Sequence, residues 1–354
     1  MQSLVFTLSP GLELCKVIER MAPEGGVFTL CDSNTASLVY PLMTQDCPYL
    51  NNNTLIVTPA GDENKTLAHL SHIWEELQRL GATRHSLLIN MGGGMVTDMG
   101  GFAAATFKRG MRCVNVPTTL LGAVDASIGG KTGINFGELK NEIGVFAEAE
   151  SVIISPIYFN TLRKEEFLSG YAEMLKHGLL QSSESIHSLL AKDATRLDNQ
   201  EMLELLRNNI SVKQKIVEQD PTERGLRKAL NLGHTFGHAF ESWHLKSGSP
   251  VPHGYAVAWG LVCALILSHM HLKFDATLLR DVAKYVERNY GAPQLRCSHY
   301  NELVDLMRHD KKNVNATHIQ FTLLKAPGKP ETGHEAKEDD IKITLDLMRD
   351  LMHV

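Results

Sequence analysis

Along the first 155 residues, short apolar and β-branched runs alternate with segments in which apolar residues recur at helical spacing. The runs predict buried strands at 27–31, 54–58, 86–90 and 113–116. The intervening segments predict helices at 65–80 and 95–107. Strands that alternate with helices in this way favour an open, Rossmann-like parallel α/β sheet.

Beyond about Ser155 the strand pattern nearly vanishes and amphipathic helical patterns take over. These patterns predict helices at 165–180, 201–217, 229–243, 255–271 and 278–288. The change divides the chain into a predicted α/β domain, 1–156, and a mainly α-helical domain, 157–354. The segment 325–339 is rich in Gly, Lys and Glu and predicts an exposed loop.

The composition narrows the class of protein. The chain has 354 residues, 43% hydrophobic and 21% charged, which allows a large core and two domains. Its net charge of -5, with dispersed Lys and Arg, argues against a nucleic-acid partner. The longest apolar stretch, 256–267, is too short to span a bilayer and predicts a buried helix, and no secretory pattern begins the sequence. Six cysteines without CxxC spacing indicate free thiols in a reducing cytoplasm.

Three separated segments carry potential metal ligands. Glu173 lies in GYAEMLKHG, His234 and His238 lie in LNLGHTFGHAFE, and His253 lies in PHGYAVAWG. Two imidazoles and a carboxylate leave a coordination position open, as a catalytic Zn²⁺ requires. Because the sequence has 16 His, most of them ordinary, the prediction of one site depends on the combination.

A glycine-rich turn predicts a nucleotide site. The glycines at 92–94 follow a predicted strand and open a helix, where backbone N–H groups can receive a pyrophosphate. Thr97 stands where the dinucleotide fingerprint has a third glycine, so the turn alone equally fits a simple strand-to-helix connection. Asp32, Asn34 and Asp62 follow neighbouring strands at the carboxyl edge of the sheet, where a carboxylate can hold ribose hydroxyls.

The stretch VPTTLLGAVDASIGGKTGIN places charge in an apolar, glycine-rich segment. A solvated loop is one interpretation. The alternative is that its apolar part is buried and holds Asp125 and Lys131 near the edge of the sheet, where a buried charge needs a partner.

Seven segments, in order along the chain, resemble the 3-dehydroquinate synthase family of sugar-phosphate cyclases: PAGDENK, GGGMVTDMGGFAAATFKRG, VPTTLLGAVDASIGGKTGIN, GELKNEIG, GYAEMLKHG, ERGLRKALNLGHTFGHAFE and PHGYAVAWG. The resemblance spans roughly residues 26–325. It implies a cytoplasmic lyase of the shikimate pathway that converts 3-deoxy-arabino-heptulosonate 7-phosphate to 3-dehydroquinate and phosphate. The implied reaction combines transient oxidation by NAD, phosphate β-elimination, re-reduction and intramolecular aldol closure.

The resemblance also implies roles for individual residues. NAD would contact Asp32, Asn34, Asp62, Lys65, Gly93, Gly94, Met95, Asp98, Thr118, Thr119, Lys140 and Thr161. Zn²⁺ or Co²⁺ would be held by Glu173, His234 and His253. Substrate would meet Asp125, Lys131, Asn141, Lys176, Lys213, Arg227, Asn231, His238 and one of Lys311 or Lys312, with Arg109 donated by the other subunit of a homodimer. The implied catalytic groups are His238, Glu223, Lys131 and Asn141.

Physical chemistry bears on three of these residues. His234 and His238 are four positions apart on a predicted helix and share a face, so one can bind metal while the other meets substrate. His253 follows Pro252 at the start of an apolar helix, where the positive end of the helix dipole disfavours protonation of the imidazole.

Three positions depart from the family pattern. Asp62 replaces a Glu, Thr97 replaces a Gly, and Tyr255 replaces a Glu that is a possible acid near His253. The shorter side chain of Asp62 leaves the affinity for the cofactor open. The loss of an acid at Tyr255 leaves open how the surroundings of His253 adjust the properties of the metal site.

Three alternative functions remain open from the sequence. A sister cyclase of sedoheptulose 7-phosphate or glucose 6-phosphate would keep the fold and cofactors, but Asn141, Asn231 and His238 argue against it. A metal-dependent polyol dehydrogenase with the same two-domain fold would release NADH as a product. Its substrate carries no phosphate, so the many lysines suited to binding phosphate argue against it. A non-catalytic scaffold predicts loss of polar site residues, and none is lost.

Overall fold

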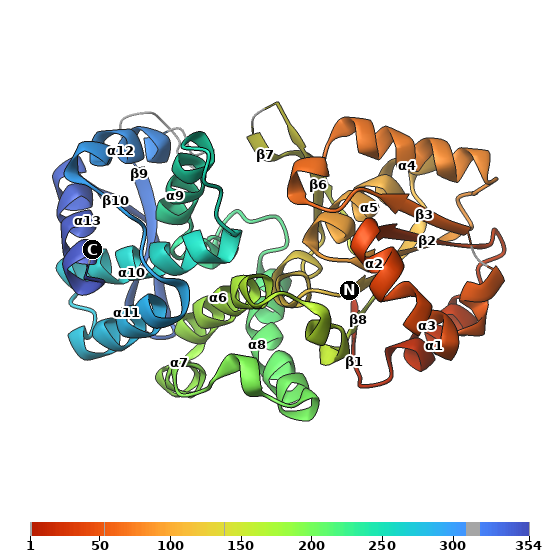
Figure 1. Ribbon diagram of the computed structural model, residues 1–354, viewed down its shortest axis with the longest axis horizontal. Coiled ribbons are helices and arrows are strands. Elements are labelled where there is room, and N and C mark those ends of the chain that lie inside the picture. The colour runs from red at the N-terminus through yellow and green to blue at the C-terminus, as the bar shows by residue number, and fades with distance from the viewer. Residues whose placement is uncertain (1, 53, 138, 309–318, 354) are drawn as a thin grey trace. The chain divides into compact units, whose positions relative to one another are not determined.

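The computed structural model describes residues 2–52, 54–137, 139–308 and 319–353, which fold into two compact units (Figure 1). The first unit comprises Met1–Arg163 and Leu197–Ile210, and the second comprises Lys164–Arg196 and Ser211–Val354. Each unit has its own arrangement of helices and strands, and each is described by itself.

A six-stranded parallel sheet forms the centre of the first unit, in the order β1-β8-β5-β4-β2-β3. Its strands are β1 (Ser3–Phe6), β2 (Val27–Asp32), β3 (Thr54–Thr58), β4 (Leu87–Gly92), β5 (Arg112–Pro117) and β8 (Ser151–Ile154). The predicted open parallel sheet is therefore confirmed, and four of its strands coincide with the apolar runs in the sequence. Strands β1 and β8 were not predicted, since each is only four residues long.

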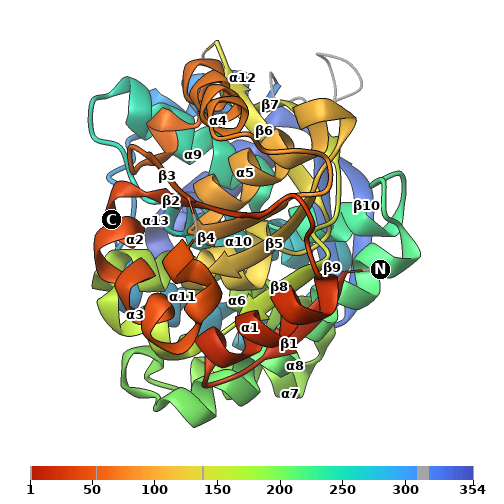
Figure 2. The same ribbon diagram turned by 90° about the vertical axis from the view of Figure 1, so that its right-hand side faces the viewer.

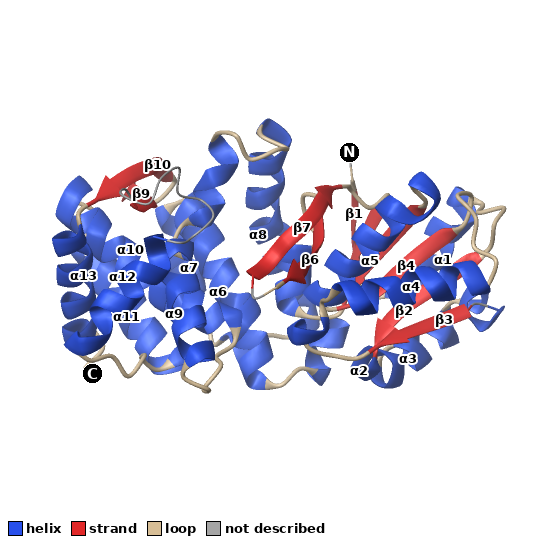
Figure 3. Ribbon diagram, turned by 90° about the horizontal axis from the view of Figure 1, so that it is seen from above, coloured by secondary structure: helices blue, strands red, loops and turns tan. Residues whose placement is uncertain are grey.

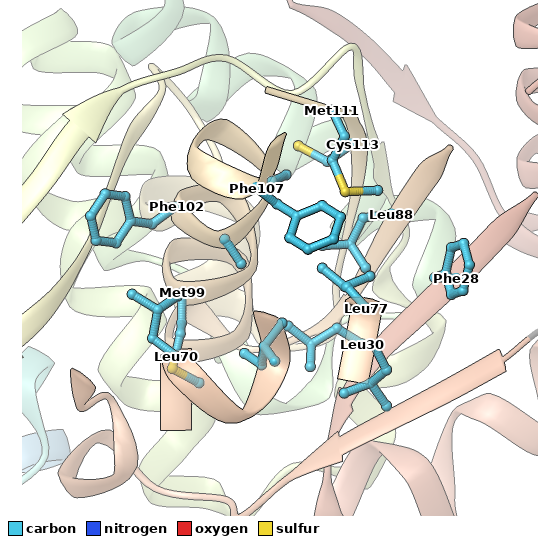
Figure 4. Packing of buried hydrophobic residues seen from close by; sticks show 14 of the residues in the cluster. Phe28, Leu30, Leu70, Leu77, Leu88, Met99, Phe102, Phe107, Met111 and Cys113 are labelled. Carbon is cyan, nitrogen blue, oxygen red and sulfur yellow. The ribbon is translucent and has the colours of Figure 1, made fainter. Parts of the chain in front are cut away.

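Helices cover both faces of this sheet (Figure 2). Helices α4 (Leu67–Arg79) and α5 (Gly94–Thr106) lie on one face, and α1 (Pro10–Met21), α2 (Ser33–Leu38) and α3 (Tyr40–Asp46) lie toward the other. Strand β4 alternates between the two cores, because Leu88 joins the cluster of α4 and α5 whereas Leu87 and Ile89 join the cluster of α1 and α3. Figure 4 shows the first cluster, where Leu70, Leu77 and Met99 pack against the sheet.

An antiparallel hairpin completes the first unit. A π-helical turn, Gly122–Ala126, follows β5 and leads to β6 (Lys131–Phe136), which pairs with β7 (Leu139–Phe146). Strand β6 packs against α5, and every residue of β7 is exposed. Of the two interpretations of the segment that holds Lys131, burial of this lysine is wrong, because Lys131 begins β6 at the rim of the hairpin and is exposed.

The second unit is mainly helical (Figure 3). Its helices are α6 (Lys164–Gln181), α7 (Ser183–Leu190), α9 (His234–Lys246), α10 (His253–Leu272), α11 (Ala276–Tyr290), α12 (Tyr300–Arg308) and α13 (Glu338–Leu351), and α8 (Asn199–Gln219) has residues in both units. Helix α10 contacts α6, α9, α11 and α13. It is long and apolar enough to cross a membrane, but 72% of its most apolar window is buried, as in the core helix of a globular protein.

Two predicted elements of the second unit were wrong. The segment 325–339 is not a loop, because β9 (Ile319–Ala326) and β10 (Lys329–Ala336) form a hairpin that turns at Gly328, whose φ is +76°. The polar residues that suggested a loop lie on the mostly exposed strand β10. The helix expected at 229–243 is interrupted, because Leu226–Asn231 is a 3-10 turn and Gly233, with φ +77°, precedes α9.

Candidate functional site

Three helices of the second unit meet through glycines at the place where the predicted metal ligands lie. A Cβ on Gly260 of α10 would lie 2.0 Å from the Gly233 carbonyl oxygen, so α9 and α10 approach as closely as backbones allow. A Cβ on Gly254 would lie 2.0 Å from the Ser169 carbonyl oxygen, which brings the start of α10 equally close to α6. The Gly254 N–H also donates to Ser169 Oγ at 2.9 Å. Backbone packing therefore fixes where the ligand-bearing turns of the three helices sit.

Glu173 from α6, His234 from α9 and His253 from α10 form one cluster whose candidate ligand atoms lie within 4.8 Å of one another. His234 Nε2 is 3.5 Å from Glu173 Oε1, and His253 Nε2 is 3.6 Å from the same oxygen. Ligand atoms in a tetrahedral Zn²⁺ site stand about 3.3 Å apart, given bonds of about 2.0–2.1 Å. The spacing of the three side chains therefore fits a metal ion.

Hydrogen bonds orient both imidazoles toward Glu173. His234 Nδ1 lies 3.1 Å from the Leu232 carbonyl oxygen, and His253 Nδ1 lies 3.2 Å from Glu241 Oε2. An acceptor at Nδ1 favours the proton there, which leaves the Nε2 lone pair of a neutral imidazole facing the carboxylate. Two lone pairs and a carboxylate oxygen that face one another form a donor set suited to Zn²⁺ or Co²⁺.

Glu173 is fully buried, and neither carboxylate oxygen has a hydrogen bond of normal geometry. Lys176, one turn later on α6 and 1% exposed, forms an ion pair with Oε2. Burial raises the pKa of Glu173, but Lys176, His234 and His253 outweigh it and hold the pKa well below its usual range. The buried carboxylate is therefore ionised, as a metal ligand must be.

The electrostatics of His253 differ from the sequence-based expectation. Burial lowers the pKa of His253, but Glu241 and Glu173 outweigh it and raise the pKa to about 10. The sequence predicted that the helix dipole would disfavour protonation of His253. The two nearby carboxylates favour protonation, and their influence on the pKa outweighs that of the dipole. A divalent cation at this place would replace the proton between His253 Nε2 and Glu173, while the Nδ1 proton stays with Glu241.

His238 stands next to the ligands without joining them. Its ring centroid lies 5.4 Å from that of His234 and 6.1 Å from that of His253. The His238 side chain is half-buried. The group of candidate ligands consists of Glu173, His234 and His253 and does not include His238. His234 and His238 thus lie side by side on one face of α9, as their helical spacing predicted, and His234 is the one that belongs to the ligand group.

Further predicted substrate residues belong to the same unit. Arg227 is 1% exposed and donates from Nη1 to the Pro221 carbonyl oxygen at 2.6 Å. Asn231 Nδ2 donates to Glu223 Oε1 at 3.0 Å, which pairs two of the predicted residues directly. Lys213 is 6% exposed. Lys311 and Lys312 lie outside the described residues.

In the first unit, an ionic network lies beside the carboxyl edge of the sheet. Buried Lys65 is ion-paired with Asp98 and contacts Asn141 Oδ1, while exposed Lys140 Nζ lies 3.0 Å from Asp62 Oδ2. Burial raises the pKa of Asp98, although Lys65 opposes that shift. The network gathers five residues that were predicted from different segments.

The predicted phosphate turn is tightly packed. Gly93 is the N-cap of α5. A Cβ at this position would lie only 3.0 Å from Thr119 Cγ2, so a side chain larger than that of glycine would crowd Thr119. Asp32 caps α2, accepting from the backbone N–H groups of Asn34 at 2.8 Å and Thr35 at 2.9 Å.

The other predicted residues of the first unit differ in exposure. Gly94, Met95, Thr119 and Asp125 are half-buried and Thr118 is buried, whereas Arg109 and Thr161 are exposed.

Sequence reasoning missed Glu241. It lies on α9 seven residues after His234 and three after His238, so it shares their face of the helix. That spacing was an available signal. Tyr255, in contrast, packs its ring against those of Tyr290 and Trp259, with centroids 5.1 and 6.4 Å away. The carboxylate beside His253 therefore comes from α9, and the departure at position 255 leaves that imidazole with an acidic partner.

Comparison with known proteins identifies similar chains. Residues 55–169 match the family model described as 3-dehydroquinate synthase N-terminal, and residues 170–313 match 3-dehydroquinate synthase C-terminal. The 3-dehydroquinate synthase of Parabacteroides distasonis is 46% identical over 324 residues, covering 92% of this chain and 91% of that protein. The same enzyme of Leptospira interrogans is 35% identical, covering 94% and 91% respectively.

Solved structures share the fold at low sequence identity. A 2-deoxy-scyllo-inosose synthase complexed with carbaglucose-6-phosphate, NAD⁺ and Co²⁺ has a TM-score of 0.82 at 21% identity, covering 98% of this chain and 96% of that chain. A 2-epi-5-epi-valiolone synthase from Streptomyces hygroscopicus with NAD⁺ and Zn²⁺ has a TM-score of 0.75 at 24% identity, covering 92% and 91%. A glycerol dehydrogenase from Schizosaccharomyces pombe has a TM-score of 0.65 at 12% identity, covering 99% and 90%.

Replacing His234 by Ala should remove tightly bound metal, whereas replacing His238 by Ala should leave it in place. The reason is that His234 Nε2 faces Glu173 and His238 stands outside the ligand group. Zn²⁺ content after dialysis against a chelator measures the difference. Equal loss of metal in the two variants would show that the assignment of ligand and neighbour is wrong.

Replacing Glu241 by Gln should weaken Zn²⁺ binding by about 10–100-fold, the usual effect of losing an outer partner of a metal-bound histidine. The amide keeps the shape of the side chain but removes its charge from His253 Nδ1. A competition titration with a chromophoric chelator gives the affinity, and Glu218→Gln, which changes an exposed side chain of α8, is the matched control. An unchanged affinity in Glu241→Gln would exclude the role.

Proposed function

This chain belongs to the 3-dehydroquinate synthase family, and from that premise we propose how its residues carry out the family's reaction. The enzyme is a carbon-oxygen lyase of the shikimate pathway, which leads to aromatic amino acids. It converts 3-deoxy-arabino-heptulosonate 7-phosphate to 3-dehydroquinate and phosphate. The observation that carries the site assignment is the cluster of Glu173, His234 and His253.

NAD and a divalent metal ion are the cofactors of this reaction. When bound, NAD supplies a reversible hydride acceptor and the metal supplies a Lewis acid that lowers the pKa of coordinated hydroxyls. Glu173, His234 and His253 would hold the ion, because their facing donors match its ligand set. Whether the native ion is Zn²⁺ or Co²⁺ is a matter for metal analysis, since the same donors suit both.

The remaining polar residues of the helical domain would act on the substrate. His238, beside the ligands but outside them, is placed to move a proton as acid or base. Glu223 is the second proposed proton acceptor, and Asn231 donates to it. A hydrogen bond from an amide keeps the carboxylate oriented.

Cationic side chains would recognise the substrate's carboxylate and phosphate. Lys176, Lys213 and Arg227 are buried in the second unit of a protein whose net charge is -5. Lys176 pairs with Glu173, and cationic side chains held in place inside a protein attract a further anion, so we infer that these positions favour an anionic ligand over a neutral polyol. We assign Lys131, Asn141 and Asp125 of the first unit, together with Lys311 or Lys312, to the same substrate.

We propose that NAD binds along the carboxyl edge of the sheet in domain 1–156, leaving metal and substrate binding mainly to domain 157–354. The pyrophosphate would lie against the turn at Gly93, Gly94 and Met95, with Thr118 and Thr119 adjacent. Asp32, Asn34, Asp62, Lys65, Asp98, Lys140 and Thr161 would complete the site. Asp62, shorter than the family's Glu, keeps a cationic partner in Lys140.

We propose a cytoplasmic homodimer in which Arg109 reaches the neighbouring subunit's site. Arg109 is exposed, has φ +68° and ends the turn after α5. The β6–β7 hairpin, which packs on α5, exposes Phe136 by 52%, Leu139 by 59% and Phe146 by 55%. Apolar side chains gathered on an exposed hairpin favour burial against a second copy of the chain.

The substrate assignment can be tested against the alternatives. We expect purified enzyme with NAD⁺ and metal to release phosphate from 3-deoxy-arabino-heptulosonate 7-phosphate without accumulating NADH. Sedoheptulose 7-phosphate lacks the carboxylate, so it should react at least about 100-fold more slowly, because it cannot form the ion pairs and hydrogen bonds that we assign to that group. Phosphate release and absorbance of NADH measure both reactions. Preference for the sedoheptulose ester would indicate a sister cyclase, and NADH accumulation with a simple polyol would indicate a dehydrogenase.

The shared site can be tested by mixing subunits. Arg109→Ala and Glu173→Gln dimers should each be nearly inactive. Random exchange should restore roughly one quarter of wild-type activity, since half of the dimers are mixed and each has one complete site. Subunit exchange is verified with two affinity tags. If verified mixed dimers are no more active than their parents, Arg109 serves its own subunit or has no part in catalysis.

A further inference from the structure

Two cysteines of the first unit lie next to each other although they are 32 positions apart in the chain. Cys15 Sγ on α1 is 2.9 Å from Cys47 Sγ, which directly follows α3. This separation is shorter than the contact distance of two unbonded sulfur atoms and longer than the roughly 2.05 Å of a disulfide bond. A movement of less than about 1 Å would bring the sulfurs to bonding distance.

The packing of α1 against the end of α3 explains this proximity. Gly11 lies one turn before Cys15 on the same face of α1, and a Cβ on Gly11 would lie 2.4 Å from Asp46 Cβ. The absent side chain lets α1 approach the residue that precedes Cys47. Leu14 and Ile18 of α1 and Met43 of α3 are buried in one core cluster, so the two helices are firmly held.

We propose that Cys15 and Cys47 are a redox-active pair that forms a reversible disulfide with a low-molecular-weight disulfide, such as oxidised glutathione, as the oxidant. The pair fastens α1 to the end of α3. It encloses β2 and α2, and therefore Asp32 and Asn34, in a covalently closed loop.

The chemistry proceeds in two exchanges. The Cys15 thiolate attacks one sulfur of the oxidant, forms a mixed disulfide and releases one thiol. Cys47 then passes its proton to the departing thiolate as its sulfur attacks the Cys15 sulfur, which forms the protein disulfide and releases the second thiol. Two protein thiols are oxidised by two electrons, the oxidant is reduced to two thiols, and these take up the two protons.

The order of attack follows from accessibility. Cys15 is half-buried, whereas Cys47 is fully buried. Burial, followed by the hydrogen bond with Cys15, raises the pKa of Cys47 to about 12 and keeps it a thiol. A dissolved oxidant therefore meets Cys15 first, and the buried thiol resolves the mixed disulfide.

The experiment incubates the full-length enzyme with oxidised glutathione and maps its peptides by mass spectrometry without reduction. Trypsin cleaves after Lys16 and Lys65, so Cys15 and Cys47 fall in different peptides. We expect these two peptides to be linked in the wild type. Cys31 shares the second peptide, so Cys31→Ala must retain the link and Cys47→Ala must lose it. Cys297→Ser, which changes the exposed thiol, is the control and must also retain the link.

Thermal unfolding provides an independent measurement. A disulfide that closes a loop of this length should raise the midpoint of unfolding by at least about 5 °C, and a reducing agent should reverse the rise. Cys15→Ser and Cys47→Ala should show no rise. The proposal is overturned if glutathione stays on Cys15 of the wild type as a mixed disulfide, if all six thiols remain free, or if another cysteine makes the link.

Discussion

The buried carboxylate of Glu173 is the group on which the helical unit depends. An ionised side chain with no exposure is strongly unfavourable unless cations or a metal ion lie against it. Lys176 and the two imidazoles fulfil that condition, and they do so because glycines let α6, α9 and α10 meet backbone to backbone. The close helix packing and the metal chemistry are therefore two consequences of one arrangement. A larger residue at Gly254 or Gly260 would separate the ligands before it touched any of them.

The two units balance their charged side chains in different ways. In the first unit, Lys65 lies against Asp98 and Asn141, so the charges beside the sheet neutralise one another within the protein. In the second, two carboxylates flank His253: Glu241 lies against Nδ1, and a divalent cation would take the place of the proton between Nε2 and Glu173. The excess of negative charge around this imidazole therefore suits a metal ion.

Periodicity predicted the parts of the fold in which one pattern dominates. The runs that became β2, β4 and β5 are buried on both faces, so their apolar character was continuous. Strand β10 was missed because it is an exposed partner in a two-stranded hairpin and carries polar residues. Glu241 and the Cys15–Cys47 pair depend on side-chain direction and on contacts between distant segments, which spacing alone does not fix. The cluster of Glu173, His234 and His253 was predictable because a donor set is a matter of residue type as well as position.

Architecture alone does not decide the reaction. Cyclases and a glycerol dehydrogenase share this fold with the present chain at 12–24% identity, so sheet, helices and general plan fit several chemistries. The side chains that meet the ligand therefore have to distinguish these reactions. Here Lys176, Lys213 and Arg227 are buried in the helical unit, and Lys176 pairs with Glu173. Cationic side chains held in place inside a protein favour an anionic ligand over a neutral one, so under the proposed assignment the choice of a phosphorylated sugar acid depends on these cations rather than on the cluster of Glu173, His234 and His253.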